Sequence, residues 1–440
     1  MSSASPIPAG LAGPIWSAVP AGRATAAAGT RLLHLPYWLM LTALTFNAAL
    51  AFVNGNVRPL TPAVVIALEG ALTLGCLLVA LLHHRREMNL AVAFIVWLFL
   101  FMILRSAIVD PATSVKYFRD LLIAPTFFML GLCTDRRYLN RYVLIGHTIV
   151  FTIGALEAFR TDLYSSLFHV KDYFIATRGL TEADFWNSDS DLFVSATRPN
   201  ARFLSIADAV MASHRVSSVF LEPVSLGTYC IIASAYLFAL WRSLGWKSRA
   251  YLLSTNLFLI VACDGRLAFV TFFATLFVCV FWRRWSRYLP ALYLPGILLA
   301  AFVFVHIVDP ARGNDDFLGR VVWTTDLLES YDVSEFLGLS EAFIDKAVDS
   351  GVGYIITTQS IFGLALFWLF CSCCSRYATR EQICFNHALC LYVCFNSLVS
   401  YGFLSIKTAA LLWLVKGIIE IGQAPPAPGG ARLPARPLLR

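Results

Sequence analysis

Charged residues are scarce in this sequence, and that scarcity excludes an ordinary water-soluble domain. Of the 440 residues, 14% are Asp, Glu, Lys or Arg, whereas 58% are hydrophobic. Soluble domains carry roughly 25% charged residues, so this chain cannot cover its surface with groups that water solvates. The apolar excess therefore faces lipid, and the sequence predicts an integral membrane protein.

Several motifs are missing as well. The sequence has no Walker A loop and no GxGxxG loop, which argues against an ATP-driven pump and against a dinucleotide-binding enzyme. The acids around Asp315 and Asp316 lack the spacing of an EF-hand. We interpret Asp189-Ser190-Asp191 as a chance DxD form, because no nucleotide sugar is expected outside the cytoplasm. We therefore expect neither a metal ion nor a cofactor.

Cysteine is absent from the two longest polar segments, residues 160–222 and 309–352. No disulfide is expected in either segment. Most of the eleven Cys lie inside apolar runs, where a free thiol packs as a small hydrophobic group. We interpret the close trio Cys371, Cys373 and Cys374 in the same way, since no His lies near it.

Long apolar runs are abundant, and they predict an all-α fold of about twelve membrane-spanning helices. The runs lie at approximately residues 35–53, 62–82, 89–109, 117–133, 142–159, 223–241, 248–263, 265–282, 288–308, 353–374, 383–401 and 404–420. Together they predict one membrane domain over residues 35–420. The flanking segments 1–34 and 421–440 are rich in Ala, Pro and Gly and are expected to be disordered tails.

The distribution of Lys and Arg predicts the orientation of the chain. The two tails and one alternate set of short loops, with the adjoining helix ends, hold nineteen Lys and Arg, and the opposite set holds six. The positive-inside rule places the richer set in the cytoplasm, so both termini are expected there, as an even number of spans requires. Clusters of this kind between apolar runs are typical of membrane topology and not of a nucleic-acid surface.

This orientation places the two long segments, 160–222 and 309–352, on the same non-cytoplasmic face. Loops of this length are usually functional or disordered. The first contains aromatic residues and charges of both signs, and the second contains ten Asp or Glu. Apolar residues at helical spacing in the second (Val321, Val322, Leu327, Leu328) predict short amphipathic helices at the membrane interface. We expect the functional site in these loops and at the helix ends beside them.

Arginines and carboxylates near these helix ends indicate a site for a phosphorylated lipid. An Arg guanidinium binds phosphate oxygens at two points and stays charged, and a carboxylate or His accepts the proton of an attacking sugar hydroxyl. The candidate catalytic residues are Arg215, Glu222, Arg266 and Asp349. The candidate substrate-binding residues are Arg178, Arg202, His214, Arg320, Tyr354 and Lys407.

Each candidate also has a structural interpretation. An Arg at a membrane surface often only extends to the lipid headgroups, and Glu222 before Pro223 is typical of a helix start. Asp349 precedes Ser350-Gly351, a turn sequence, and Lys407 lies where it would fix a helix end. His214 is by default an ordinary residue of an exposed loop. These alternatives stay open at the level of the sequence.

Several segments resemble the superfamily of O-antigen polymerases and ligases, that is, Wzy-type polymerases. They are RVSSVFLEPVSLG from Arg215 to Gly227, Asp264-Gly265-Arg266, Gly319-Arg320, and DSGVGY from Asp349 to Tyr354. The segment SIKTAALLW from Ser405 to Trp413 is similar to exopolysaccharide polymerases of the xanthan type. The resemblance covers about residues 35–420. Eleven residues separate Arg215 from Gly227 here, where some members have ten.

The resemblance implies a GT-C-like fold and a glycosyltransferase of the bacterial inner membrane. Such an enzyme polymerises undecaprenyl-diphosphate-linked oligosaccharide repeat units into exopolysaccharide without a bound metal. The lipid bilayer, a chain-length regulator and a flippase of the same pathway are the implied partners, and nucleic acid is not. The alternatives are a ligase that transfers glycan to a lipid A core, and a transporter that flips lipid-linked oligosaccharide. A transporter usually has internal repeats and charges at the bilayer midplane, and neither is evident in the sequence.

Overall fold

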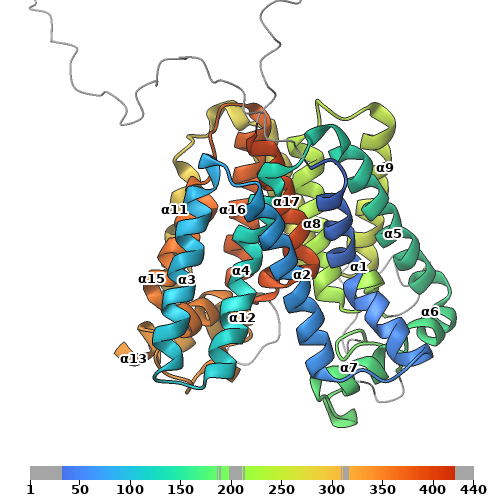
Figure 1. Ribbon diagram of the computed structural model, residues 1–440, viewed down its shortest axis with the longest axis horizontal. Coiled ribbons are helices and arrows are strands. Elements are labelled where there is room, and N and C mark those ends of the chain that lie inside the picture. The colour runs from blue at the N-terminus through green and yellow to red at the C-terminus, as the bar shows by residue number, and fades with distance from the viewer. Residues whose placement is uncertain are drawn as a thin grey trace, which may run out of the picture. The chain divides into compact units, whose positions relative to one another are not determined.

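The computed structural model describes residues 32–421, except 186, 188, 189, 198–210, 212, 213, 309 and 311–316. Among these residues the ordered elements are helices, and the one β pairing is an isolated bridge between Leu32 and Thr134. This confirms the all-α prediction for the described part of the chain (Figure 1).

Each apolar run that the sequence predicted coincides with a helix in the described part of the chain. The helices are α1 (Leu35–Asn56), α2 (Pro62–Leu82), α3 (Asn89–Ser106), α4 (Pro111–Cys133), α5 (Leu139–Phe159), α8 (Pro223–Ala239), α9 (Trp246–Ala262), α10 (Arg266–Val280), α11 (Leu289–Val308), α15 (Gly351–Cys373), α16 (Arg380–Ser397) and α17 (Ile406–Glu420). The start of α4 was predicted too late. The Asp110 carboxylate accepts a hydrogen bond from the Thr113 amide at 2.9 Å and so begins the helix at Pro111.

Six helices in the described part of the chain are long and apolar enough to cross a membrane. They cover Leu35–Asn56, Pro62–Leu82, Arg86–Ser106, Arg136–Phe159, Leu289–Val308 and Gly351–Cys373. The helices α8 and α10 are apolar but shorter. In α4 the apolar sequence is interrupted by Lys116, Arg119 and Asp120. The composition of these helices indicates a membrane protein.

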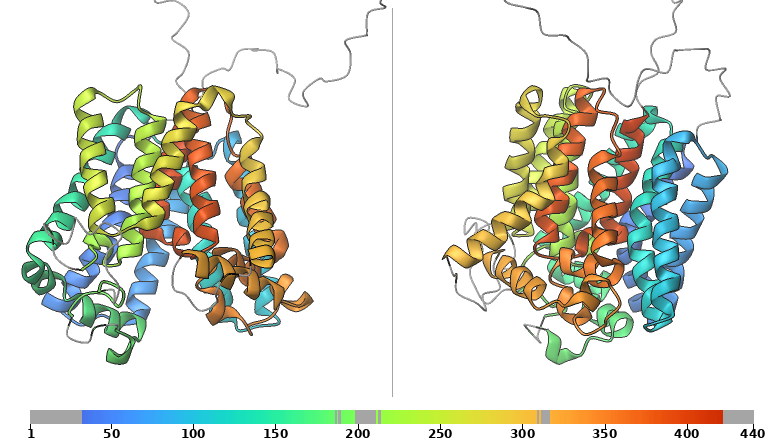
Figure 2. Two further views of the ribbon diagram at one scale, coloured as in Figure 1. Left: turned by 180° about the vertical axis from the view of Figure 1, so that it is seen from behind. Right: turned by 90° about the vertical axis from the view of Figure 1, so that its left-hand side faces the viewer.

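The two long polar segments form short helices at one end of the long helices, which we call the loop end. The first segment forms α6 (Thr161–Phe168) and α7 (Val170–Arg178), and the second forms α12 (Phe317–Glu329), α13 (Val333–Phe336) and α14 (Ile344–Ala347). All three views place them at the same end (Figures 1 and 2). Helix α12 buries the apolar residues from which the sequence predicted an amphipathic helix.

Helices α4 and α17 lie in close contact and run in the same direction (Figure 1). A Cβ atom on Gly417 would lie 2.2 Å from the Phe128 carbonyl oxygen, and one on Gly131 would lie 2.4 Å from the Leu414 carbonyl oxygen. Two glycines therefore permit backbone contact between the helices. Because Asp120 and Lys407 precede these glycines by similar numbers of residues, the same packing sets them at about the same depth.

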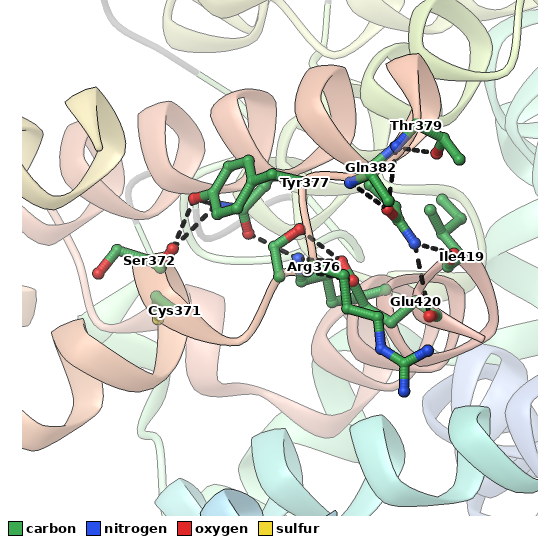
Figure 3. A network of polar contacts seen from close by, with 12 residues as sticks. Cys371, Ser372, Arg376, Tyr377, Thr379, Gln382, Ile419 and Glu420 are labelled. Carbon is green, nitrogen blue, oxygen red and sulfur yellow. Dashed lines mark hydrogen bonds and ion pairs between the residues drawn. The ribbon is translucent and has the colours of Figure 1, made fainter. Parts of the chain in front are cut away.

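A buried polar network joins helix ends at the end of the bundle opposite the loop end, and Figure 3 shows part of this network. The Lys416 ammonium, which is 0% exposed, lies 2.7 Å from the Glu420 carboxylate and donates to the Asn386 side-chain oxygen at 2.6 Å. Glu420 also accepts from the Arg376 amide at 2.9 Å, and the Gln382 side chain donates to the Ile419 carbonyl at 3.1 Å. The network joins α16, α17 and the segment between α15 and α16.

Candidate functional site

Glu222, at the start of α8, lies between two cations. Its Oε1 is 2.6 Å from the Arg178 guanidinium at the end of α7, and its Oε2 is 2.6 Å from the Lys407 ammonium at the start of α17. The Ser225 hydroxyl donates to Oε2 at 2.7 Å. Three segments far apart in the sequence therefore meet at this carboxylate, and each of them contributes a residue that the sequence analysis named as a candidate.

The two cations keep the Glu222 carboxylate ionised. Burial alone would raise the pKa of Glu222, but the charges of Arg178 and Lys407 and the hydrogen bonds from Lys407 and Ser225 outweigh it and lower the pKa to about 2. A carboxylate with so low a pKa is a poor proton acceptor near neutral pH. In this arrangement we expect Glu222 to orient the two cations rather than to accept a proton.

A second charged group lies on α2 and α4. The Arg119 guanidinium is 2.7 Å from the Asp120 carboxylate and 3.3 Å from the Glu69 carboxylate. The Tyr354 hydroxyl at the start of α15 donates to Asp120 at 2.7 Å. Tyr354 also stacks on Tyr401, with 4.5 Å between ring centroids.

Helix packing brings the two groups together. Helix α2, which carries Glu69, contacts α7, which carries Arg178, and α4, which carries Arg119 and Asp120, contacts α17, which carries Lys407. We call the combined set the loop-end cluster, and it consists of Glu69, Arg119, Asp120, Arg178, Glu222, Tyr354, Tyr401 and Lys407.

The segment before α8 is held in a strained conformation that fixes the position of Glu222. Ser218 and Leu221 have φ angles of 54° and 61°, in the left-handed region that these residues rarely adopt. The buried Glu157 carboxylate on α5 accepts hydrogen bonds from the Ser217 and Ser218 amides at 2.8 and 2.6 Å. The Tyr164 hydroxyl donates to the Ser218 carbonyl at 2.8 Å. Strain of this kind persists where the surroundings impose it, commonly at functional sites.

Replacing Glu157 with alanine is expected to destabilise the protein by about 3–5 kcal/mol, because two buried amides lose their acceptor. Asp162→Ala removes an exposed carboxylate from the neighbouring α6 and is the matched control, expected to change stability by less than about 0.5 kcal/mol. Unfolding of the purified proteins in detergent measures both. Equal stability of the two variants would contradict the role given to Glu157.

The structure places Arg215 and His214 away from the contacts of Glu222. The buried Arg215 side chain donates to the carbonyls of Cys263 and Ser195, at 3.1 and 3.4 Å, and so ties the first loop to the turn between α9 and α10. His214 is buried rather than exposed, and its Nε2 lies 3.6 Å from Glu157. These contacts of Arg215 and His214 hold the first loop in position.

The structure describes three further candidates, Arg320, Asp349 and Arg266. Arg320 on α12 pairs with Asp349 at 2.7 Å and donates to the Val399 carbonyl at 3.1 Å. Arg266 begins α10, is exposed, and forms no side-chain hydrogen bond or ion pair within the described residues. Arg202 lies outside the described residues.

A buried arginine that sequence reasoning did not single out fixes the second loop. Arg105, at the end of α3, is 1% exposed and donates to the Gly338 carbonyl at 3.1 Å. Its guanidinium lies 5.1 Å from the centre of the Tyr117 ring. Gly338 has a φ angle of 70°, and a Cβ atom there would lie 2.8 Å from the Ser360 amide nitrogen. These contacts hold α13 against α3 and α15.

Sequence reasoning also missed Glu69, Arg119, Asp120 and Glu157, although a usable signal was present. Each is an ionisable residue in or near an apolar run, where charge is costly and usually has a role. Chemically, the loop-end cluster combines cations able to bind an anion with carboxylates able to accept a proton.

The chain matches no protein-family model, no curated protein and no solved structure in the comparisons made with each.

Proposed function

We propose that this protein is a membrane glycosyltransferase that joins polyprenyl-diphosphate-linked oligosaccharide repeat units into a polysaccharide. The observation that carries the proposal is the pair of cations, Arg178 and Lys407, held on either side of Glu222 at the loop end. A lipid diphosphate needs cationic groups next to an apolar surface, and undecaprenyl diphosphate is the carrier that the family resemblance implies.

Arg178 is suited to meet the diphosphate first. Its side chain is 47% exposed, whereas the side chain of Lys407 is 5% exposed. The guanidinium also lies 4.7 Å from the centre of the Phe174 ring, which restricts its orientation. Diphosphate oxygens compete with Glu222 for these cations, and the cations in turn offset the charge that develops on the leaving group.

The apolar surface needed by the lipid tail lies on the same helices. On α2 the side chains of Ile66, Leu68, Leu74 and Leu78 are exposed, whereas Glu69 on the same helix reaches the loop-end cluster. A polyprenyl chain in the bilayer can therefore lie against α2 while its diphosphate reaches the cations.

We further propose that all twelve long helices cross the bacterial inner membrane in a GT-C-like arrangement, with both termini in the cytoplasm. The excess of Lys and Arg on the opposite set of loops supports this orientation. It places the loop end, and with it the cluster, on the periplasmic side. There Arg320, Asp349 and Arg266 are available to contact the glycan.

Deletion of the gene tests the function in cells. We expect single repeat units linked to their lipid carrier to accumulate, because the carrier is loaded but the units are not joined. Accumulation of long carrier-linked chains would instead indicate a ligase. Repeat units confined to the cytoplasmic leaflet would indicate a transporter. Chain-length analysis of the extracted lipid-linked glycan, with a leaflet-specific label, distinguishes the three results.

A further inference from the structure

Glu69 is unusual among the residues of α2. It is the only charged residue between Pro62 and Leu82, in a helix that is long and apolar enough to cross a membrane. It lies seven residues after Pro62, which corresponds to about 10 Å along the helix axis. A carboxylate at this position is costly in a bilayer and indicates a function.

Of the three carboxylates in the loop-end cluster, Glu69 has the fewest interactions. Its contact with Arg119 is an ion pair at 3.3 Å, and its carboxylate accepts no hydrogen bond from the described residues. Asp120 accepts two hydrogen bonds from Arg119 and one from Tyr354. Glu222 is held by two cations and a hydroxyl. Glu69 is therefore the carboxylate best able to accept a proton.

The charged residues of the loop-end cluster form two groups with net charges of opposite sign. Arg178 and Lys407 with Glu222 carry two positive charges and one negative charge, a net charge of +1. Glu69 and Asp120 with Arg119 carry two negative charges and one positive charge, a net charge of −1. The first group suits an anionic leaving group, and the second suits a hydroxyl that loses its proton.

We infer that Glu69 is the general base of the glycosyl transfer, an assignment that rests on the proposed function. The acceptor sugar hydroxyl gives its proton to the Glu69 carboxylate while its oxygen forms a bond to the anomeric carbon of the donor. The bond between that carbon and the diphosphate oxygen breaks, and its electron pair leaves with the polyprenyl diphosphate. Arg119 holds the Glu69 side chain, and the proton passes from Glu69 to water after transfer.

Glu69→Gln tests the assignment in the full-length protein reconstituted in nanodiscs. Binding is measured with undecaprenyl diphosphate, and turnover is measured with lipid-linked repeat units extracted from the deletion strain. We expect turnover to fall by about 10²- to 10⁴-fold and binding to change by less than about twofold, because the +1 group is intact. Glu87→Gln is the matched control, since Glu87 pairs with Arg376 away from the loop-end cluster, and is expected to keep normal turnover.

The pH dependence of turnover supplies a second readout. The charges that face Glu69 are those of Arg119 and Asp120 on α4, Lys407 on α17 and Arg178 on α7. Turnover by the wild-type protein is expected to fall as the pH is lowered, because Glu69 takes up a proton. The residual turnover of Glu69→Gln is expected to lack this fall. Glu69→Asp keeps a carboxylate and is expected to retain part of the activity and the acidic fall.

Each result decides the assignment. Normal turnover by Glu69→Gln overturns it, and loss of both binding and turnover in that variant also overturns it, because Glu69 is then a structural partner of Arg119. If the wild-type protein neither binds undecaprenyl diphosphate nor joins repeat units, the proposed function itself fails, and the assignment fails with it.

Discussion

Replacing Arg178 with methionine is expected to reduce the rate of polymer formation by about 10²- to 10³-fold. Arg178 is the more exposed of the two cations at Glu222, and its planar guanidinium can bind two diphosphate oxygens at once. Methionine keeps an unbranched apolar chain beside Phe174 but removes the charge. The initial rate at which repeat units are joined in nanodiscs measures the effect.

Arg160→Met is the matched control for this prediction. Arg160 is an exposed arginine at the end of α5 that forms no side-chain ion pair or hydrogen bond within the described residues. Its replacement is expected to leave the rate within about twofold of the wild type, and Arg178→Lys, which keeps a point charge without the fork, is expected to give an intermediate rate. An unchanged rate in Arg178→Met would exclude Arg178 from the site.

Replacing Glu420 with alanine is expected to destabilise the protein by about 3–5 kcal/mol. The Lys416 ammonium then stays buried without its counter-charge, and the Ser375 hydroxyl and the Arg376 amide lose their acceptor. The free energy of unfolding in mixed detergent measures the loss. Because this network lies away from the loop-end cluster, the fraction that remains folded should still bind undecaprenyl diphosphate.

The double variant Lys416→Met/Glu420→Leu separates charge pairing from packing. Replacing both members of a buried ion pair with apolar residues of similar size is often neutral or stabilising. We therefore expect the double variant to be more stable than Glu420→Ala by at least about 2 kcal/mol. A double variant as unstable as the single one would show that the pairing of Lys416 with Glu420 contributes little.

The helices could be predicted from the sequence because apolar runs of sufficient length are sharply bounded by polar residues. The same reasoning predicted short helices in the second loop from the apolar spacing of Val321, Val322, Leu327 and Leu328, which α12 confirms. The start of α4 was predicted too late because the apolar run was taken to begin after Lys116, whereas the Asp110 cap begins the helix at Pro111. Arg119 and Asp120 lie inside both the predicted and the observed helix, where they pair with each other.

The structure brings some of the candidate residues together and leaves others apart. Arg178, Glu222, Tyr354 and Lys407 belong to one cluster, whereas Arg215 binds backbone carbonyls elsewhere. Position at a helix end identifies residues near the membrane surface, but it does not tell which loop folds onto which helix. That depends on long-range packing, such as the contact of α4 with α17 at Gly131 and Gly417 that sets the depth of Lys407.

We propose that this protein forms glycosidic bonds between lipid-linked repeat units at the loop end. The most direct measurement is the chain length of the glycan made by the purified protein in nanodiscs from lipid-linked repeat units of the deletion strain. We predict a ladder of products longer than one unit, with one undecaprenyl diphosphate released for each bond formed and no ladder from Arg178→Met. Repeat units that remain single in the presence of folded wild-type protein would contradict the account.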